Sequence, residues 1–282
     1  MRVVTASPAH HMKSSHFLVI AAAVFTLSWA PVLPAAIYDL SATGTVVVPN
    51  PNGNAIFSID FLKTTGTGVF NPFLTILETG TEQGYNGETQ PFDTKRAPQY
   101  THELRLSDLT ISTTQDGAQF YSFLIDINES NNPLTSFITL DALKIYTSPA
   151  LQPEVTAVAN IDSLGTKIFD LDALEDSFFI YDDANTGSGQ GDIAFFIPVS
   201  AFLNTAPSDF VYIYEGFGAS LVAGAPAGSN GGFEETSLAG ALVLVTPVPE
   251  VGSLVPLIAV LGAVLGGPFV RRGFGKLSRQ TT

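Results

Sequence analysis

Residues 121–127 read YSFLIDI, and this stretch decides the fold class. Its odd-numbered positions are all apolar, whereas Ser122 and Asp126 are polar, and a period of two is the mark of a β-strand with one buried face. Turn-forming residues bound the stretch on both sides, Asp116-Gly117 before it and Asn131-Asn132-Pro133 after it. The stretch therefore predicts a strand between two turns.

The same alternation recurs along the chain, for example in residues 57–61 (FSIDF). A change of parity between residues 104–106 and 109–111 predicts a β-bulge near Ser107-Asp108. Helical signals are confined to residues 170–176 and 198–203, each long enough for one turn. Many short strands without helices between them predict an all-β fold, an antiparallel β-sandwich of jelly-roll type. Further strands are expected at residues 45–48, 69–77, 138–145, 178–181, 193–198 and 210–214.

Composition supports a folded domain and excludes thiol chemistry. Of 282 residues, 45% are hydrophobic, and 21 Phe and 8 Tyr are available to fill a core. The absence of cysteine excludes thiolate nucleophiles, thiolate zinc sites and iron–sulfur clusters.

Charge is distributed unevenly along the chain. All 26 acidic residues lie between Asp39 and Glu250, and six of the 12 basic residues lie outside that stretch. The stretch therefore carries a net charge of −20, against −14 for the whole chain. Such a surface repels phosphate groups, so nucleic acid is not expected as a partner. It favours solubility, or the binding of cations such as Ca²⁺.

The N-terminus, residues 1–36, has the pattern of a secretory signal peptide. Lys13 gives it a basic start, residues 17–30 (FLVIAAAVFTLSWA) are apolar, and the small residues Ala35-Ala36 offer a cleavage site before Ile37. Translation starts at Met1 or at Met12. The alternative is an uncleaved anchor helix, which the short apolar run and the prolines after it disfavour.

The C-terminal tail, residues 246–282, has the layout of a stop-transfer segment. TPVPE at 246–250 leads into the apolar residues 254–270, and Arg271-Arg272 follow at once. Seventeen residues in a helix span roughly 25 Å, which is close to the thickness of a bilayer core. We expect a transmembrane helix whose basic end stays in the cytoplasm. Residues 37–245 between the two ends form the acidic β-domain.

Pro249, Glu250, the apolar span and the pair Arg271-Arg272 resemble the PEP-CTERM sorting signal, which exosortase-type membrane proteases process. Val251 stands where that pattern has a second proline. The body is also similar to a recurring class of PEP-CTERM proteins, with matching stretches at residues 66–72, 81–86, 106–109, 124–129, 140–146, 187–192 and 231–235. The resemblance implies an exported protein that passes through the inner membrane and reaches the cell surface or the extracellular matrix. The alternative is a permanent single-pass anchor.

Residues 181–192 (YDDANTGSGQGD) are the first candidate for a metal site. Asp182, Asp183, Asn185 and Asp192 offer the oxygen ligands that Ca²⁺ prefers, on a glycine-rich loop. The spacing begins like an EF-hand loop but lacks its later Glu. The alternative is a polar hairpin loop. Two further acidic clusters and the pair Glu234-Glu235 could each bind a cation or have a purely structural role. The first cluster is Asp170, Asp172, Glu175 and Asp176, and the second is Asp126, Asn128, Glu129 and Asn131.

No catalytic motif is present in the sequence. The β-domain has one histidine, His102, and lacks the Gly-x-Ser-x-Gly elbow, the P-loop and the dinucleotide fingerprint. We therefore expect a non-enzymatic structural or adhesive matrix protein. A carbohydrate-binding module is the second hypothesis, with extracellular polysaccharide as partner and Tyr85, Tyr100 and Tyr181 expected on loops. A glycoside hydrolase, which needs only two carboxylates, is the third.

Overall fold

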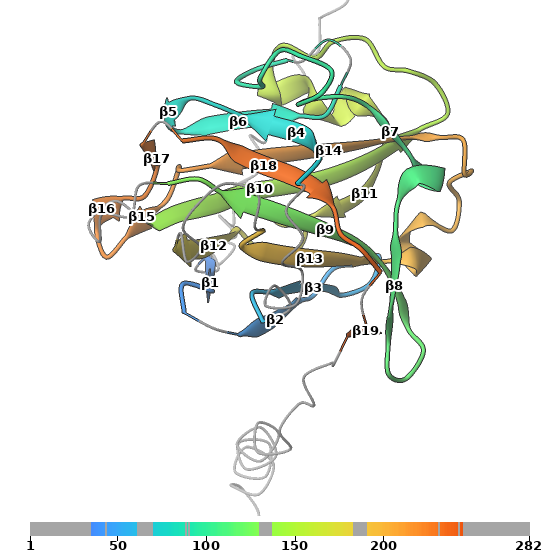
Figure 1. Ribbon diagram of the computed structural model, residues 1–282, viewed down its shortest axis with the longest axis horizontal. Coiled ribbons are helices and arrows are strands. Elements are labelled where there is room, and N and C mark those ends of the chain that lie inside the picture. Colours follow the sequence, from blue (N-terminus) through green and yellow to red (C-terminus); the bar gives the residue numbers. More distant parts are fainter. Residues whose placement is uncertain are drawn as a thin grey trace, which may run out of the picture. The chain divides into compact units, whose positions relative to one another are not determined.

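The computed structural model describes residues 35–42, 44–60, 70–87, 89, 91–129, 137–182, 191–230, 232–241 and 243–244. Two large sheets make up this part of the chain (Figure 1). The first sheet has the strand order β1-β12-β10-β14-β6; in addition, β11 pairs with β10, and β7 pairs with β14. Its strands are β1 (Ala36–Asp39), β6 (Glu82–Tyr85), β7 (Leu104–Arg105), β10 (Phe137–Ser148), β11 (Thr166–Asp170), β12 (Ser177–Asp182) and β14 (Phe210–Phe217).

The second sheet has the order β19-β8-β9-β13-β3-β2, and β18 lies between β9 and β4. Its strands are β2 (Thr45–Val48), β3 (Ala55–Ser58), β4 (Pro72–Ile76), β8 (Ile111–Thr114), β9 (Gln119–Ile127), β13 (Ile193–Pro198), β18 (Glu234–Leu238) and β19 (Val243–Leu244). Two small pairs complete the strands: β5 (Thr79–Gly80) with β17 (Ser229–Asn230), and β15 (Leu221–Val222) with β16 (Ala225–Pro226). Among the described strands only β1–β12 and β19–β8 pair in parallel. The predicted all-β, largely antiparallel fold is confirmed.

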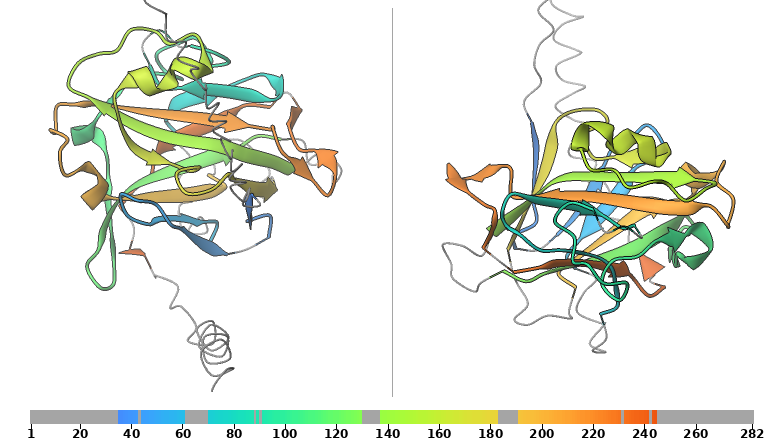
Figure 2. Two further views of the ribbon diagram at one scale, coloured as in Figure 1. Left: turned by 180° about the vertical axis from the view of Figure 1, so that it is seen from behind. Right: turned by 90° about the horizontal axis from the view of Figure 1, so that it is seen from above.

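The main hydrophobic core lies between the two sheets, which form layers in Figure 2. Phe57 of β3 meets Phe179 of β12 across the layers, with ring centroids 4.3 Å apart. Within the second sheet Phe195 stacks on Phe123 at 4.7 Å. The aromatic residues that the sequence supplies therefore fill the space where the sheets face each other.

A second cluster covers the outer face of the first sheet. It joins tyrosines of β6, β10 and β14 to the segment at residues 149–164, which contains the 3-10 turn Val158–Leu164. The hydroxyl of Tyr146 donates to Asp162 Oδ1 at 2.6 Å, and the hydroxyls of Tyr85 and Tyr212 accept the backbone N–H groups of Val155 and Gln152 at 2.9 Å. The tyrosines thus fasten this segment to the sheet.

The local predictions have mixed outcomes. The strands at 45–48 and 193–198 are confirmed with the same bounds, and the turn expected at 198–203 is the 3-10 turn Val199–Phe202. The bulge expected near Ser107-Asp108 is wrong, because a 3-10 turn at Leu106–Asp108 changes the parity there. Residues 171–175 form turns and bends and no helix.

Candidate functional site

Acidic side chains gather on the inner faces of β6, β14 and β18, at one end of the core. In β14, Val211, Ile213 and Phe217 belong to the core, so Glu215 at the same parity also points between the sheets. Glu82 of β6 pairs with Phe217, and Glu234 of β18 pairs with Ile127 of β9. The exposed fractions of Glu82, Glu215 and Glu234 are 0%, 1% and 1%.

Glu215 links the two sheets through Thr236. The Thr236 hydroxyl lies 2.8 Å and 3.0 Å from the two carboxyl oxygens of Glu215, so β18 of the second sheet is bonded to β14 of the first. Burial raises the pKa of Glu215 to about 8, and the hydrogen bond from Thr236 only partly offsets this. Glu215 is therefore a neutral acid at pH 7.

The Tyr181 side chain lies close to Glu215 in the same core. Its exposed fraction is 1%, and its hydroxyl has no hydrogen-bond partner among the described residues. Burial, and then the charge of Glu215, raise the pKa of Tyr181 well above its ordinary value. Tyr181 is thus a core residue of β12.

Three carboxyl groups form a continuous contact at the end of the row. The carboxyl of Glu234 lies within hydrogen-bonding reach of the carboxyls of both Glu82 and Glu129, so Glu234 is the middle member. Burial, and then the neighbouring carboxyls, raise the pKa of Glu234 well above its ordinary value, and burial also raises the pKa of Glu82. Carboxyl groups in such contact share protons, as a pair of like charges cannot both ionise cheaply in a buried site.

A different set of acids lies on the outer face of the second sheet. Glu235 pairs with Asp126 of β9 and receives a 3.4 Å hydrogen bond from the Thr75 hydroxyl. Burial and then the charge of Asp126 raise the pKa of Glu235, and the positive charge of nearby Lys95 partly offsets this rise. The ammonium group of Lys95 also lies 3.6 Å from the centre of the Tyr100 ring. The successive residues Glu234 and Glu235 therefore face two different environments, as expected for a strand.

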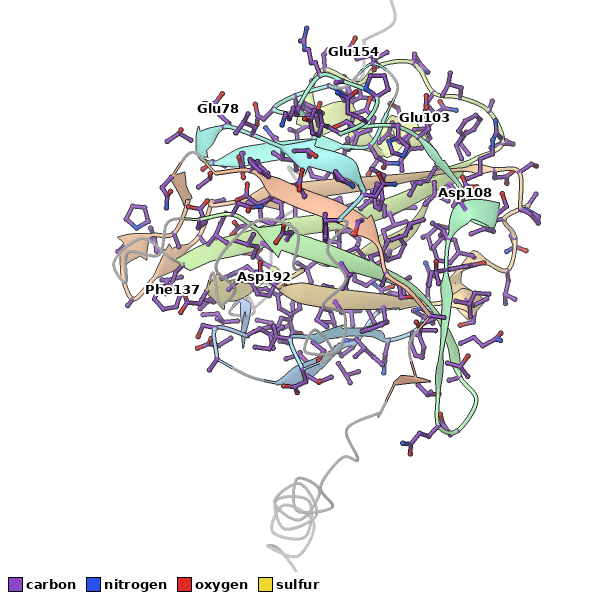
Figure 3. The ribbon with its side chains drawn as sticks, viewed as in Figure 1. Glu78, Glu103, Asp108, Phe137, Glu154 and Asp192 are labelled. Carbon is purple, nitrogen blue, oxygen red and sulfur yellow. The ribbon has the colours of Figure 1, made fainter. Side chains whose placement is uncertain are left out.

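The structure describes only part of the predicted calcium loop. Asp183 and Asn185 lie outside the described residues, Asp182 ends β12, and Asp192 precedes β13. Figure 3 shows Asp192 beside β9 and β13, where its Oδ2 accepts the N–H of Ile127 at 2.8 Å. Asp192 thus has a structural task, joining the loop to β9. Among the described residues no set of three or more His, Asp or Glu side chains is arranged to hold a metal ion.

The other acidic clusters mostly support turns. Asp170 accepts the N–H of Asp172 and a 2.9 Å bond from Lys167, and Asp172 accepts the N–H of Ser177. In the second of these clusters Asn131 lies outside the described residues, and the amide of Asn128 donates to Phe233 O at 2.9 Å. Of these residues, only Glu129 joins the buried carboxyl contact.

Of the three tyrosines that the sugar-binding hypothesis placed on loops, Tyr100 lies in a turn as expected and the other two lie in strands. Tyr85 and Tyr181 are strand residues with exposed fractions of 2% and 1%, so that expectation is wrong for both. Tyr100 is half-buried beneath Lys95. His102 is also half-buried, and its backbone N–H donates to Phe73 O at 3.0 Å. The rings of Tyr85 and Tyr181 are therefore too buried to stack on a sugar, and Lys95 covers one face of the Tyr100 ring.

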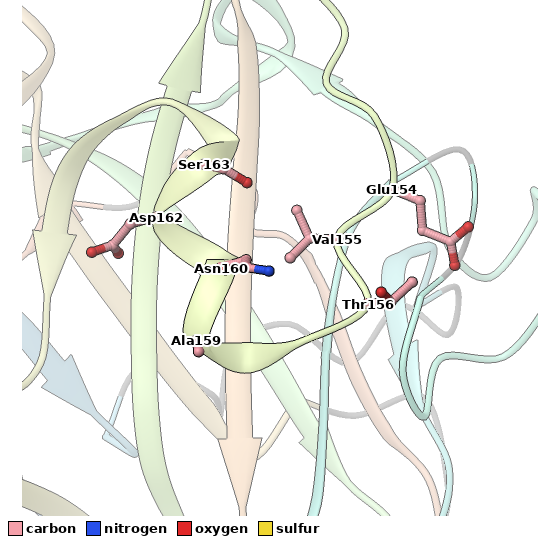
Figure 4. Close-up of a pocket in the computed structure, with 7 residues that line it drawn as sticks. All are labelled: Glu154, Val155, Thr156, Ala159, Asn160, Asp162 and Ser163. Atoms are coloured by element: carbon pink, nitrogen blue, oxygen red, sulfur yellow. The ribbon is translucent and has the colours of Figure 1, made fainter.

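A cavity with a volume of about 520 Å³ lies against the 3-10 turn Val158–Leu164 (Figure 4). Its polar lining includes Glu154, Asn160 and Ser163, whose side chains come from the turn and from the segment leading to it. The buried carboxyls do not line it. In a glycosidase the two catalytic carboxyls lie about 5–9.5 Å apart and reach the substrate, whereas Glu82, Glu129 and Glu234 are buried inside the protein.

Sequence reasoning did not find Glu82 or Glu215. Glu215 lies one residue beyond the strand predicted at 210–214, so that strand does not place it at the same parity as Val211 and Ile213. A strand extended to Phe217 would have placed it in the core. Glu82 lies in the stretch EQGY, whose sequence has no apolar alternation that could reveal a strand.

The remaining predicted site residues lie outside the described part of the chain: Pro249, Glu250, Arg271 and Arg272, with the apolar span 254–270. Among the helices of the described residues, none has the length and apolar character needed to cross a bilayer. Comparison of the chain with protein-family models, with curated proteins and with solved structures found no match.

Proposed function

We propose that this chain is an exported, non-catalytic structural or adhesive protein of the cell surface or extracellular matrix. Its β-domain is a sandwich of jelly-roll type, and its C-terminal tail is a PEP-CTERM-like sorting signal read by an exosortase-type protease. The chain would pass transiently through the inner membrane. The observation that carries the proposal is the position of the folded domain between the two expected processing sites.

The first described strand begins where signal cleavage is expected. β1 starts at Ala36, and cleavage before Ile37 would leave residues 37–39 paired with β12. The last described strand, β19, ends at Leu244 and pairs with β8, five residues before Pro249. Both ends of the domain are therefore held in sheets, so removal of the two terminal segments would leave the core intact.

The strand order supports a jelly-roll sandwich. The chain passes from the second sheet to the first between β9 and β10, and returns between β12 and β13. It crosses again from β13 to β14 and from β14 to β18. Repeated crossing between two sheets over one core is the arrangement of such sandwiches.

The test is the intact mass and cell fraction of the protein expressed in its native host. We expect loss of the residues before about Ile37 and of those after about Glu250, with the β-domain outside the inner membrane. Replacing both Arg271 and Arg272 by Ser should leave full-length tail in the inner membrane, whereas the matched control Arg279→Ser should be processed normally. A wild-type chain that keeps its tail in the inner membrane would overturn sorting and favour the permanent anchor.

A further inference from the structure

The β5–β17 pair lies over the end of the core where the three carboxyls meet. In Figure 1 the two strands lie side by side at one end of the sheets, and Figure 3 shows Glu78 at that end. Thr79 pairs with Asn230 and Gly80 with Ser229, and the Ser229 hydroxyl donates to Glu78 O at 3.0 Å. Each of these strands has two residues, so hydrogen bonds from the buried carboxyls add to what holds the pair in place.

Two of the buried carboxyls hold this pair directly. Glu82 Oε2 accepts the N–H of Glu78 at 2.8 Å, next to β5. Glu129 Oε2 accepts the N–H of Asn230, in β17, at 3.0 Å. A different carboxyl group therefore binds β17 and the residue that precedes β5, and Glu234 lies between the two carboxyls.

The link through Glu234 requires protons. No N–H or O–H donor of the described residues reaches Glu82 Oε1, Glu129 Oε1 or either oxygen of Glu234. Two carboxyl groups hydrogen-bond only if one of them carries a proton, since an ionised carboxylate only accepts. Because Glu234 lies between its two neighbours, the closed arrangement is satisfied when Glu82 and Glu234, whose pKa values burial raises, carry protons and Glu129 accepts.

The charged groups around the three carboxyls are acidic. Asp93 acts on Glu82, Glu215 follows on the same inner face, and the side chain of Glu78 is exposed above them. Lys95 acts on Glu235, on the opposite face of β18. The described ion pairs all involve Asp162 or Asp170, at another part of the molecule. No described basic side chain thus replaces the protons.

We propose that protons on Glu82 and Glu234, beside the acceptor Glu129, form a latch, which holds the β5–β17 pair closed at acidic pH and releases it as the pH rises. The sign follows from linkage. Burial raises the pKa values of Glu82 and Glu234 in the folded protein above those of the unfolded chain, so the stabilisation is complete below the ordinary carboxyl pKa of 4.5 and is lost as the pH passes the raised values.

Hydrogen exchange of the full-length protein tests the latch. The measured quantity is the protection of the amides of residues 78–80 and 229–230, corrected for the intrinsic pH dependence of exchange, between pH 5 and pH 9. We expect protection to fall at least tenfold across this range, since losing one proton changes the opening equilibrium by about tenfold per pH unit. Constant protection in the wild type would overturn the proposal.

Two variants and one ion complete the experiment. Glu234→Gln supplies two N–H donors at every pH, so the protection of the same amides in this variant should not depend on pH. If Glu234→Gln does not fold, Glu82→Gln replaces it in the experiment. The matched control Glu78→Gln changes an exposed acid but keeps the backbone N–H that Glu82 binds, and it should behave as wild type. If 1 mM Ca²⁺ restores protection at pH 9, the three carboxyls bind a cation instead, and the latch is overturned. Protection that still depends on pH in Glu234→Gln would also overturn it.

Discussion

Replacing Glu215 by Gln is expected to make the protein more stable at pH 8 while leaving it unchanged at pH 4.5. In the folded protein Glu215 has a pKa of about 8, against 4.5 for an ordinary glutamate, because it is buried between the sheets. Between these values the folded state keeps a proton that the unfolded chain releases. The free energy of unfolding should therefore fall with rising pH, and a glutamine, which cannot ionise, should not show this loss.

The size of the effect follows from the two pKa values. A difference of roughly 3.5 units at about 1.4 kcal/mol per unit gives an upper limit of about 5 kcal/mol at pH 8 and above. At pH 4.5 the two proteins should agree within about 1 kcal/mol, because the glutamine oxygen still accepts the Thr236 hydroxyl. Its added N–H₂ group has the unpartnered hydroxyl oxygen of Tyr181 as a nearby acceptor.

Urea unfolding followed by circular dichroism, repeated from pH 4.5 to pH 9, measures this difference. The matched control is Asp176→Asn, which removes an exposed acid and should leave the pH profile of the wild type in place. The reasoning fails if Glu215→Gln shows the same pH slope as the wild type, or if the variant is the less stable protein at pH 8. The latch is measured separately, because it is a local opening and this is global unfolding.

The remaining predictions concern packing, backbone contacts and the calcium loop. Gly232→Ala should lower the free energy of unfolding in urea by about 2 kcal/mol or more, because a Cβ there would lie 1.7 Å from Asn128 O. The control Gly240→Ala, with open space around it, should change that free energy by no more than about 0.5 kcal/mol. Equal losses in the two variants would contradict the contact. Asn86→Ala should cost about 2–4 kcal/mol, because the buried amide bonds both Val211 O and Ile213 N, and a cost below about 1 kcal/mol would show that water replaces it. Phe195→Ala should cost about 3–5 kcal/mol by leaving a cavity beside Phe123, which a midpoint shift in urea unfolding would reveal and an unchanged midpoint would refute. For the loop with Asp182, Asp183, Asn185 and Asp192, calorimetry should show heat on adding millimolar Ca²⁺ that Asp183→Asn reduces, and no heat from the wild type would eliminate the site.

Most strands could be predicted because their signals are local. The alternation in residues 121–127 lies within β9, and Thr45–Val48 and Ile193–Pro198 were found with their observed bounds. Period-two patterns and turn residues reflect backbone geometry that each segment carries by itself. The apolar–polar alternation indicates less in β3, where all four residues are buried. A further apolar cluster there covers the outer face of the second sheet; it consists of Ile56, Phe120, Ala194 and Phe196.

Strand partners and the pairing of the chain ends could not be predicted in the same way. β1 pairs with β12, about 140 residues away, and no local pattern selects that partner. The parity change at residues 104–111 was visible, but a bulge and a 3-10 turn both produce it. The turn was decided by tertiary contacts, in which the N–H groups of Leu106 and Ser107 donate to Asp209 O and Pro207 O.

The amino-acid sequence by itself determined the all-β class and the strong acidity of residues 37–245, because periodicity and composition are properties of the chain alone. Only the tertiary structure decided which acids are buried. Glu82, Glu129, Glu215 and Glu234 read in the sequence like any solvated glutamate, and adjacent Glu234 and Glu235 look equivalent. The pKa values of Glu82, Glu215 and Glu234 rise because strands distant in sequence exclude water from them. This desolvation depends on what packs against a side chain, which its own segment does not specify.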